Sequence, residues 1–256
     1  MTSPPPSWPV KFLAPDDPPD SFPDPAEATT EPNGLLAVGG DLTPARLVAA
    51  YSRGIFPWYE ADQPILWWSP NPRAVLLPEE LHISRSLKRT LRSNRYSVST
   101  DLDFRAVIDA CADIRATTGT WITPEMRLAY VRLHELGLAH SVEVWRESEL
   151  VGGLYGIALG DVFFGESMFS RAPGASKLAL VGVVRQVEQR GMRLIDCQVA
   201  TSHLTSLGSR LLPRAEFLRR LQVMVPAGGQ RGAWRAAKGP TSALLAARSG
   251  EAPLRG

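Results

Sequence analysis

The alternation of apolar and polar residues along the chain is clearest between residues 141 and 170. Three stretches there, SVEVWR, ELVGGLYGIALG and DVFFGESMFS, are rich in β-branched and aromatic residues and are separated by the polar turns RESE and LGD. Runs of this composition bounded by turn residues are typical of strands, and such short turns join antiparallel neighbours. The pattern therefore predicts a three-stranded antiparallel meander.

Helical periodicity precedes this meander. Apolar residues spaced three or four apart, with capping residues before them, predict several helices. These helices begin after Thr43 and after Ser84, and span about 103–115 and about 124–136. Two short runs, AVLLP and YSVST, lie between them and predict strands.

The periodic pattern resumes after the meander. It predicts a long helix from Ser176, its expected N-cap, to Arg190, followed by a strand over MRLIDCQV. A last helix carries Phe217, Leu218 and Leu221 on its apolar side. Beyond about Gly228 we expect a loose, basic tail.

This order of elements predicts an α+β fold. Strand, helices, meander, helix, strand and helix follow one another as in the acyltransferase fold best known from the N-acetyltransferases (GNAT-like), which opens its mixed sheet to hold an acyl donor. We expect a small N-terminal domain over residues 1–70 and a GNAT-like catalytic domain, a mixed sheet flanked by helices, over residues 71–256. A fold alone does not establish a function.

The start of the chain is compositionally unusual. Residues 1–32 are rich in Pro and Asp, and we expect an extended segment on the surface, ordered in part by Trp8 and Phe12. The stretch GLLAVGGDL that follows predicts a glycine-rich turn before the first helix. It does not match a phosphate-binding loop.

The stretch GIFPWYEADQPILWWSPNPR, residues 54–73, has neither helical nor strand periodicity. It places three of the seven tryptophans within eleven positions, at Trp58, Trp67 and Trp68, and four prolines interrupt it. We interpret it as the junction between the domains, with these tryptophans and Trp121 of GTWIT in loops. They either cover the core or form platforms for unstacked bases, a contact worth about 1–3 kcal/mol per base.

Composition narrows the class of protein. The chain has 256 residues, of which 44% are hydrophobic and 21% charged, as in globular proteins. No apolar run approaches the roughly 20 residues that a membrane span needs, and the N-terminus lacks the features of a secretory signal. Two cysteines and four histidines form neither a disulfide framework nor a metal-ligand spacing. We therefore expect a cytoplasmic protein without a structural metal.

The net charge of the chain is +2, but the charged residues are unevenly distributed along it. Residues 1–32 hold one Lys against six Asp or Glu, whereas residues 185–256 hold twelve Lys or Arg against four acids. The segment HISRSLKRTLRSNR has five Lys or Arg and no acid. On a helix, Arg85, Lys88, Arg89 and Arg92 share one side, which is either simply solvated or suited to a nucleic-acid backbone.

Three polar residues stand out in predicted strands. Alternation places Asp196 and Gln198 on one face of MRLIDCQV, where burial without partners is costly. If GESMFS is the neighbouring strand, Glu166 joins them in one polar patch. Such a patch suits a cationic ligand or an amine nucleophile, although the side chains could instead satisfy neighbouring backbone groups.

Two further functions remain open at this point. The loop RAPGAS, Arg171–Ser176, nearly matches the loop with which acetyltransferases hold the pyrophosphate of coenzyme A, and favours a coenzyme A-dependent N-acetyltransferase. Tryptophans and a basic helix favour an RNA-binding module without catalysis. Ser176 and the loop tryptophans argue against the N-acetyltransferase. The Asp196/Gln198 face argues against an RNA-binding module without catalysis. Together the features suggest a substrate that carries both RNA and an acyl group.

Long motifs resemble those of one family. GIFPW, WWSPNPR, HISRSLKR, GTWIT, LHELGLAHSVEVW, LVGGLYG, GESMFS and IDCQV, with HLTSLG after them, are similar to the leucyl/phenylalanyl-tRNA–protein transferases. The resemblance implies an aminoacyltransferase of the bacterial N-degron pathway. Such an enzyme moves Leu or Phe, and Met less well, from aminoacyl-tRNA to proteins with an N-terminal Arg or Lys, which marks them for degradation.

The resemblance also implies roles for individual residues. Trp58 and Trp121 would bind the 3′-terminal adenosine, and Glu166, Asp196 and Gln198 would form the reaction centre and bind the acceptor N-terminus. The basic residues Arg85, Lys88, Arg89 and Arg92 would follow the tRNA acceptor stem. Leu154, where relatives often have Met, and Phe163 are our candidates for the pocket of the aminoacyl side chain.

The implied mechanism converts an ester into an amide, so we expect no ATP and no other cofactor. Asp196 would polarise Gln198, whose side-chain oxygen would accept a proton from the acceptor amine, while Glu166 helps to bind the basic acceptor residue. Alternatively Gln198 only orients the amine, and a tRNA hydroxyl or water carries the proton. The expected partners are aminoacyl-tRNA and acceptor proteins, without a membrane, and we expect a monomer.

Overall fold

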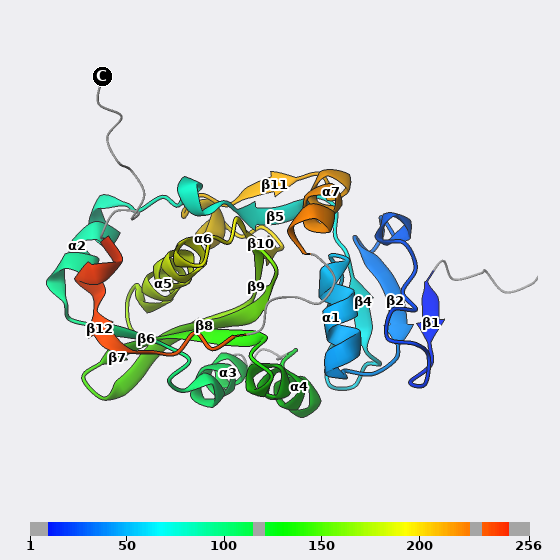
Figure 1. The fold of residues 1–256 in the computed structure, drawn as a ribbon, viewed down its shortest axis with the longest axis horizontal. Helices are drawn as coiled ribbons and strands as arrows, with labels where there is room; N and C mark the ends of the chain where they lie inside the picture. The colour runs from blue at the N-terminus through cyan, green and yellow to red at the C-terminus, as the bar shows by residue number, and fades with distance from the viewer. Residues whose placement is uncertain (1–9, 115–120, 226–231, 246–256) are drawn as a thin grey trace, which may run out of the picture.

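Two β-sheets organise the molecule. The computed structural model describes residues 10–114, 121–225 and 232–245, and Figure 1 shows a smaller sheet at one end beside a larger sheet that carries helices on both faces. Within these described ranges the smaller sheet has four strands and the larger sheet eight. The α+β class that the order of elements predicts is confirmed.

The smaller sheet has the strand order β1-β2-β4-β3, in which β1 and β2 are parallel and the other pairs antiparallel. Its strands are β1 (Lys11–Leu13), β2 (Leu35–Gly39), β3 (Phe56–Pro57) and β4 (Leu66–Trp68), and helix α1 (Pro44–Ser52) follows β2. The predicted turn over residues 34–42 is therefore wrong for most of its length. LLAVG forms a strand, and the backbone has positive φ at the flanking glycine Gly34 and at Gly39 and Gly40.

Trp67 and Trp68 lie in β4 and not in a loop as predicted. The Trp67 ring is fully buried, donates a hydrogen bond to the carbonyl oxygen of Gly39 at 2.8 Å and meets the Phe22 ring edge-on at 4.8 Å. Trp67 is thus a core residue, one of the two roles considered for it. Trp68 donates to the carbonyl oxygen of Trp58 at 2.7 Å, which ties the segment carrying Trp58 to β4.

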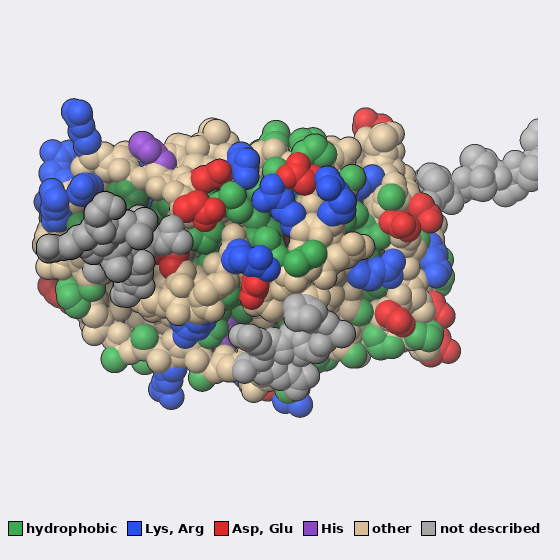
Figure 2. Space-filling model, turned by 45° about the horizontal axis from the view of Figure 1, so that its top comes forward, with side chains coloured by type: hydrophobic (Ala, Val, Ile, Leu, Met, Phe, Trp, Pro, Cys, Tyr) green, Lys and Arg blue, Asp and Glu red, His purple; other side chains and the backbone are tan. Residues whose placement is uncertain are grey.

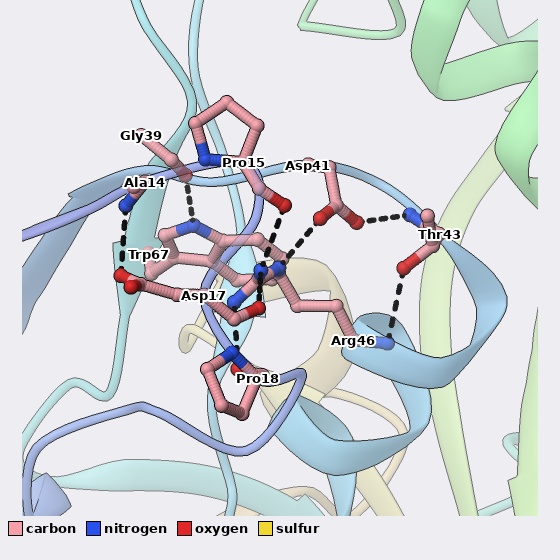
Figure 3. A network of polar contacts seen from close by, with 9 residues as sticks. All are labelled: Ala14, Pro15, Asp17, Pro18, Gly39, Asp41, Thr43, Arg46 and Trp67. Atoms are coloured by element: carbon pink, nitrogen blue, oxygen red, sulfur yellow. Dashed lines mark hydrogen bonds and ion pairs between the residues drawn. The ribbon is translucent and has the colours of Figure 1, made fainter.

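The described part of the Pro/Asp-rich segment lies along the smaller sheet and is held by its backbone carbonyls (Figure 3). Two arginines donate to these oxygens: Arg46 to those of Pro15, Asp17 and Pro18, and Arg53 to those of Asp20, Phe22 and Pro23. Arg46 is buried and also pairs with Asp41 at 3.0 Å. Phe12 is 71% exposed, so it does not order this segment as predicted, and Trp8 lies outside the described residues.

The larger sheet has the strand order β11-β5-β10-β9-β8-β7-β6-β12. Its strands are β5 (Arg73–Leu76), β6 (Ser97–Thr100), β7 (Ala139–Arg146), β8 (Glu149–Leu159), β9 (Val162–Ser170), β10 (Leu194–Gln198), β11 (Arg210–Leu212) and β12 (Ala236–Pro240). Strands β7, β8 and β9 form the predicted antiparallel meander. β10 runs parallel to β9, so the sheet is mixed.

The described part of the basic tail is not loose throughout. β12 pairs with β6 at the edge of the larger sheet, and a 3₁₀ helix, η3 (Thr241–Leu245), follows it. Lys238 of β12 lies 3.7 Å from the centre of the Trp145 ring, a cation–π contact. The prediction is wrong for this stretch because long-range strand pairing, rather than local propensity, orders it.

Helices cover both faces of the larger sheet (Figure 1). α3 (Phe104–Asp113) and α4 (Pro124–Glu135) pack on one face, and α5 (Ala175–Gln189) packs on the other beside α2 (Arg85–Ser93). The remaining helices are short or peripheral: η1 (Pro25–Glu27), η2 (Pro78–Glu80), α6 (Ser202–Thr205) and α7 (Arg214–Met224).

Side-chain caps explain where several helices begin. Thr43, Ser84, Asp103 and Thr123 each accept a hydrogen bond from a backbone N–H in the first turn of α1, α2, α3 and α4, as their residue types favour. The predicted cap at Ser176 is wrong. Helix α5 begins at Ala175, and its N-cap is Gly174, with φ 79° and no side-chain hydrogen bond.

Candidate functional site

A cavity opens between the two parallel strands of the larger sheet. β9 and β10 pair at three positions, from Val162 opposite Leu194 to Phe164 opposite Asp196. Beyond this pairing both strands are irregular, because the register shifts where β8 meets β9 and again between Asp196 and Gln198. A cavity of about 660 Å³ lies against these ends and is lined from both strands. An opening in the sheet is what the predicted acyltransferase fold requires.

One wall of this cavity is apolar and belongs to the core under α5. Leu154 of β8 and Phe163 of β9, both predicted for a side-chain pocket, line it and are almost fully buried. Leu180 of α5 and Ile195 of β10 also line this wall, and the sequence alone did not single them out. An apolar wall of this kind suits an aliphatic or aromatic group.

Another part of the cavity wall is aromatic. Trp58, which is 47% exposed, and Trp121, from the segment before α4, both line the cavity. A second cavity, of about 380 Å³, also has both tryptophans in its wall, together with Tyr59 and Trp68. The Trp58 and Trp68 rings lie 5.9 Å apart at a tilt of 58°. The structure thus brings together the two tryptophans that the sequence analysis paired.

The polar centre of the cavity consists of Gln198 and Glu166. Gln198 Nε2 donates to Glu166 Oε1 at 2.8 Å, and the other carboxylate oxygen accepts from the Tyr130 hydroxyl at 2.8 Å. The Tyr130 hydroxyl in turn contacts that of Tyr51. Because an ionised carboxylate only accepts hydrogen bonds, it holds the NH₂ end of the Gln198 amide. The Gln198 oxygen is then the end that remains for a ligand.

Burial dominates the electrostatics of this centre. It raises the pKa of Glu166 from 4.5 to about 7, an effect that the hydrogen bonds from Tyr130 and Tyr51 partly oppose and the charge of Asp196 reinforces. Burial and the Glu166 charge raise the pKa of Tyr130 well above 10, so this hydroxyl stays a donor. Glu166 therefore changes charge near neutral pH, as functional carboxylates often do. The sequence did not single out either tyrosine.

Asp196 is fully buried and is not among the described residues that line the cavity. Its carboxylate accepts from Nε and Nη2 of Arg73 at 2.8 and 2.6 Å, and Oδ1 also accepts from the backbone N–H of Gln198 at 2.9 Å. The alternation used to place Asp196 and Gln198 on one face breaks at the register shift, where Gln198 has φ 60°. Asp196 thus meets the backbone of Gln198, whereas we expected it to polarise the side chain.

Arg73 is a residue that the sequence analysis missed. It is fully buried at the start of β5, in the otherwise apolar run RAVL. The sequence could have indicated its importance, because a charged residue in a buried strand requires a partner of opposite charge.

The predicted basic side of α2 is present. Leu87 and Leu91 are buried, whereas Arg85, Lys88, Arg89 and Arg92 are exposed. Figure 2 shows Lys and Arg side chains gathered at the end of the molecule that carries α2. The structure therefore leaves these cations accessible to a polyanion.

Within the described ranges, no group of three His, Cys, Asp or Glu side chains is placed to hold a metal ion. In the same ranges, no helix is long and apolar enough to cross a membrane. The RAPGAS loop leads into the N-terminus of α5, and Ser176 lines the cavity.

A mixed sheet that opens around a cavity, with an apolar wall and a polar amide–carboxylate centre, defines a protein of the acyltransferase class. Family profiles specify the kind of acyl transfer. Residues 75–222 match the profile described as leucyl/phenylalanyl-tRNA protein transferase, and residues 40–71 match the profile of the N-terminal domain of the same family. The chain belongs to this family.

Individual relatives carry the name of the same family. The chain is 62% identical over 202 residues to the leucyl/phenylalanyl-tRNA–protein transferase of Pseudomonas entomophila strain L48, covering 78% of this chain and 89% of that protein. It is 56% identical over 214 residues to the enzyme of the same name from Nitrosomonas eutropha, covering 83% and 92%. A solved structure, that of L-PGS from Bacillus licheniformis, matches with a TM-score of 0.39 and 9% identity over 66% of this chain and 56% of that one.

Family membership settles the class of function. The protein is an aminoacyltransferase that moves an aminoacyl group from tRNA to a protein. The alternatives of a coenzyme A-dependent N-acetyltransferase and of an RNA-binding module without catalysis are therefore wrong.

Proposed function

We propose that this enzyme transfers Leu and Phe, and Met less well, from aminoacyl-tRNA to the N-terminal Arg or Lys of an acceptor protein. The new peptide bond creates a destabilising N-terminus of the N-degron pathway in the cytoplasm. The observation that carries the proposal is the fixed amide of Gln198, whose NH₂ end is held by Glu166 at the opening of the sheet. Its remaining oxygen is an acceptor for the N–H of an attacking amine.

The two walls of the cavity suit the two halves of the aminoacyl end. Trp58 and Trp121 would bind the terminal adenosine, because a tryptophan stacks on any base. Leu154 and Phe163, together with Leu180 and Ile195, would receive the Leu or Phe side chain. The ester carbonyl then lies between these walls, at the depth of the polar centre.

The exposed cations of α2 would bind the backbone of the acceptor stem. Arg85, Lys88, Arg89 and Arg92 carry no ion pair with the described residues. Their charge is therefore available to phosphates, and binding of this kind does not depend on sequence.

The chemical step needs an amine held against the ester carbon. The amine nitrogen forms the new C–N bond, the C–O bond to the 3′-terminal ribose breaks, and the released ribose oxygen takes the proton that the amine loses. Gln198 would accept a hydrogen bond from that amine and so align it, and an α-amino group with a pKa of about 7.7–8.0 is already partly neutral at cellular pH. Alignment of this kind supplies much of the rate in reactions of two bound groups.

Glu166 would help to bind the basic N-terminal residue of the acceptor in the same cavity. It is partly buried, lines the cavity and holds Gln198, so its charge also favours a basic acceptor residue. In this proposal Glu166 and Gln198 contact the substrates, while Asp196 supports Gln198 from behind.

The organisation of the chain is part of the proposal. The smaller sheet uses residues 11–68 and the larger sheet residues 73–240, which supports a division into residues 1–70 and 71–256. That the enzyme acts as a monomer is also part of the proposal.

The test is a transfer assay with purified protein. Radiolabelled leucyl-tRNA is mixed with a peptide that begins with Arg or with a matched peptide that begins with Ala, without ATP, ribosomes or coenzyme A. We expect label on the Arg peptide alone. Equal labelling of both peptides would contradict the acceptor rule, and tight tRNA binding without any transfer would contradict the proposed reaction.

A further inference from the structure

Arg73 connects three parts of the molecule. Its guanidinium lies 4.7 Å from the centre of the Phe56 ring and 4.8 Å from that of the Phe217 ring. Nη1 donates to the carbonyl oxygen of Gly54 at 3.1 Å, and Nε and Nη2 donate to the two oxygens of Asp196. An arginine fixed in this way presents a rigid fork, unlike an exposed ion pair.

The residue next to this pair has an unusual backbone. Gln198 has φ 60°, a region that residues other than glycine seldom occupy. The N–H of Val199 donates to the carbonyl oxygen of Cys197 at 2.7 Å, which closes a three-residue turn with Gln198 at its centre. Such a turn with positive φ is rare and strained, and it persists only where the surroundings hold it.

Asp196 is the group that holds this turn. Its Oδ1 accepts from the N–H of Gln198 at 2.9 Å while the Arg73 fork fixes the carboxylate. The turn coincides with the register shift between β10 and β5, where Asp196 lies opposite Val75 and Gln198 opposite Ala74. The strand therefore bends at the point where Gln198 must leave the sheet to reach Glu166.

We infer that Arg73 is a positioning residue that acts through Asp196: it holds the strained turn at Gln198 and so directs the Gln198 amide at the acceptor amine. The inference rests on the role proposed above for Gln198. On this account the charge of Asp196 does not act on the amine. It is neutralised by Arg73, and the pair serves as an anchor for the backbone.

The variant Arg73→Lys tests this inference. A lysine keeps the charge but cannot bind both carboxylate oxygens and the Gly54 carbonyl in one plane. We expect kcat for transfer to an Arg peptide to fall about 10- to 100-fold. The strained turn at Gln198 relaxes when Asp196 is no longer fixed by two hydrogen bonds from position 73, and the Gln198 amide then loses its orientation. The KM for aminoacyl-tRNA should change less than about twofold, since Trp58, Trp121 and the cations of α2 are not substituted.

Asp196→Asn supplies a second measurement, which is also available if Arg73→Lys folds poorly. It should lower kcat to a similar extent, and the double variant should be about as slow as the slower single variant, because both changes act through one anchor. Hydrogen exchange of the amides of Gln198 and Val199 should accelerate in each variant, while that of α5 stays unchanged.

Arg46→Lys is the matched control, since Arg46 is also buried and paired with an aspartate, in the smaller sheet. It should lower the melting temperature and leave kcat of the folded enzyme unchanged. Wild-type kcat in Arg73→Lys, or an equal loss of kcat in Arg46→Lys, would overturn the inference. Gln198→Ala separates it from the proposed function: an active Gln198→Ala variant contradicts the role of Gln198 itself, whatever Arg73 does.

Discussion

The ionisation of Glu166 makes a prediction that joins stability to activity. Burial raises the pKa of Glu166 from 4.5 to about 7. Between these two pH values the folded protein keeps a proton that the unfolded chain has lost, so stability falls as pH rises through this window. At about 1.36 kcal/mol per pKa unit, the loss is at most about 3 kcal/mol once pH exceeds 7. Glu166→Gln has nearly the same shape and lacks this loss.

The variant should therefore become more stable relative to wild type as pH rises from 5 to 8. In contrast to its stability, the activity of the variant should be lower than that of wild type at high pH. A glutamine at position 166 both donates and accepts, so it no longer selects the NH₂ end of Gln198, and we expect kcat at pH 8 to fall about tenfold. We expect wild-type kcat to rise near pH 7, where Glu166 loses its proton. This rise should be absent from the variant, whose kcat should then depend on pH only through the acceptor amine.

Two measurements check this prediction. Urea unfolding between pH 5 and 8 gives the free energy of unfolding of both proteins, and transfer from saturating leucyl-tRNA to an Arg peptide gives kcat over the same range. Parallel stability profiles for variant and wild type would refute the raised pKa. Diverging stability profiles with identical kcat profiles would refute the orienting role of Glu166 and leave its electrostatics intact.

Three further predictions concern binding and stability. Trp58→Ala should weaken binding of aminoacyl-tRNA by the 1–3 kcal/mol that a stacked base contributes, roughly 5- to 150-fold, with little change in the melting temperature; unchanged binding would remove Trp58 from the adenosine site. Reversing charge at Lys88 and Arg89 together should weaken binding of many tRNAs alike and lower the salt slope by about 2, as filter binding can show, whereas a loss confined to one tRNA would contradict backbone contact. Arg46→Ala should cost about 1–3 kcal/mol of stability in urea unfolding, because it removes the donor to three carbonyl oxygens and to one carboxylate oxygen of Asp41; a loss below about 1 kcal/mol would mean that the segment it holds adds little to the fold.

Local signals were enough for much of the fold. The meander is predictable because period-two alternation and short turns leave few alternatives to antiparallel neighbours. The helices after Thr43, Ser84 and Thr123 begin where a hydroxyl can accept a backbone N–H, and this signal needs no tertiary context. The predicted boundaries of α3 and α4 differ from the structure by only one or two residues.

Elements ordered by distant partners were not predictable in this way. β2 depends on pairing with β1 and β4, and β12 depends on pairing with β6, which lies more than 130 residues earlier in the chain. The carbonyl oxygens of the N-terminal segment accept hydrogen bonds from Arg46 in α1 and from Arg53 at its C-cap, and neither position in the sequence indicates this contact. Single-sequence patterns report local preference, so such pairings remain hidden from them.

The same distinction applies within the site. Residue type alone identified Gln198, Glu166 and Asp196 as unusual in predicted strands, but the division of labour among them depends on Arg73, 123 residues away from Asp196. Alternation, a rule for regular strands, put Asp196 and Gln198 on one face and so suggested that one side chain polarises the other. In the structure the alternation ends at Gln198, where the register shifts and the backbone has positive φ. Positions at which the backbone departs from local preference are often functional sites. A polar pair in a predicted central strand therefore indicates a site, whereas the contacts that set each residue's role become visible only when the strand's neighbours are known.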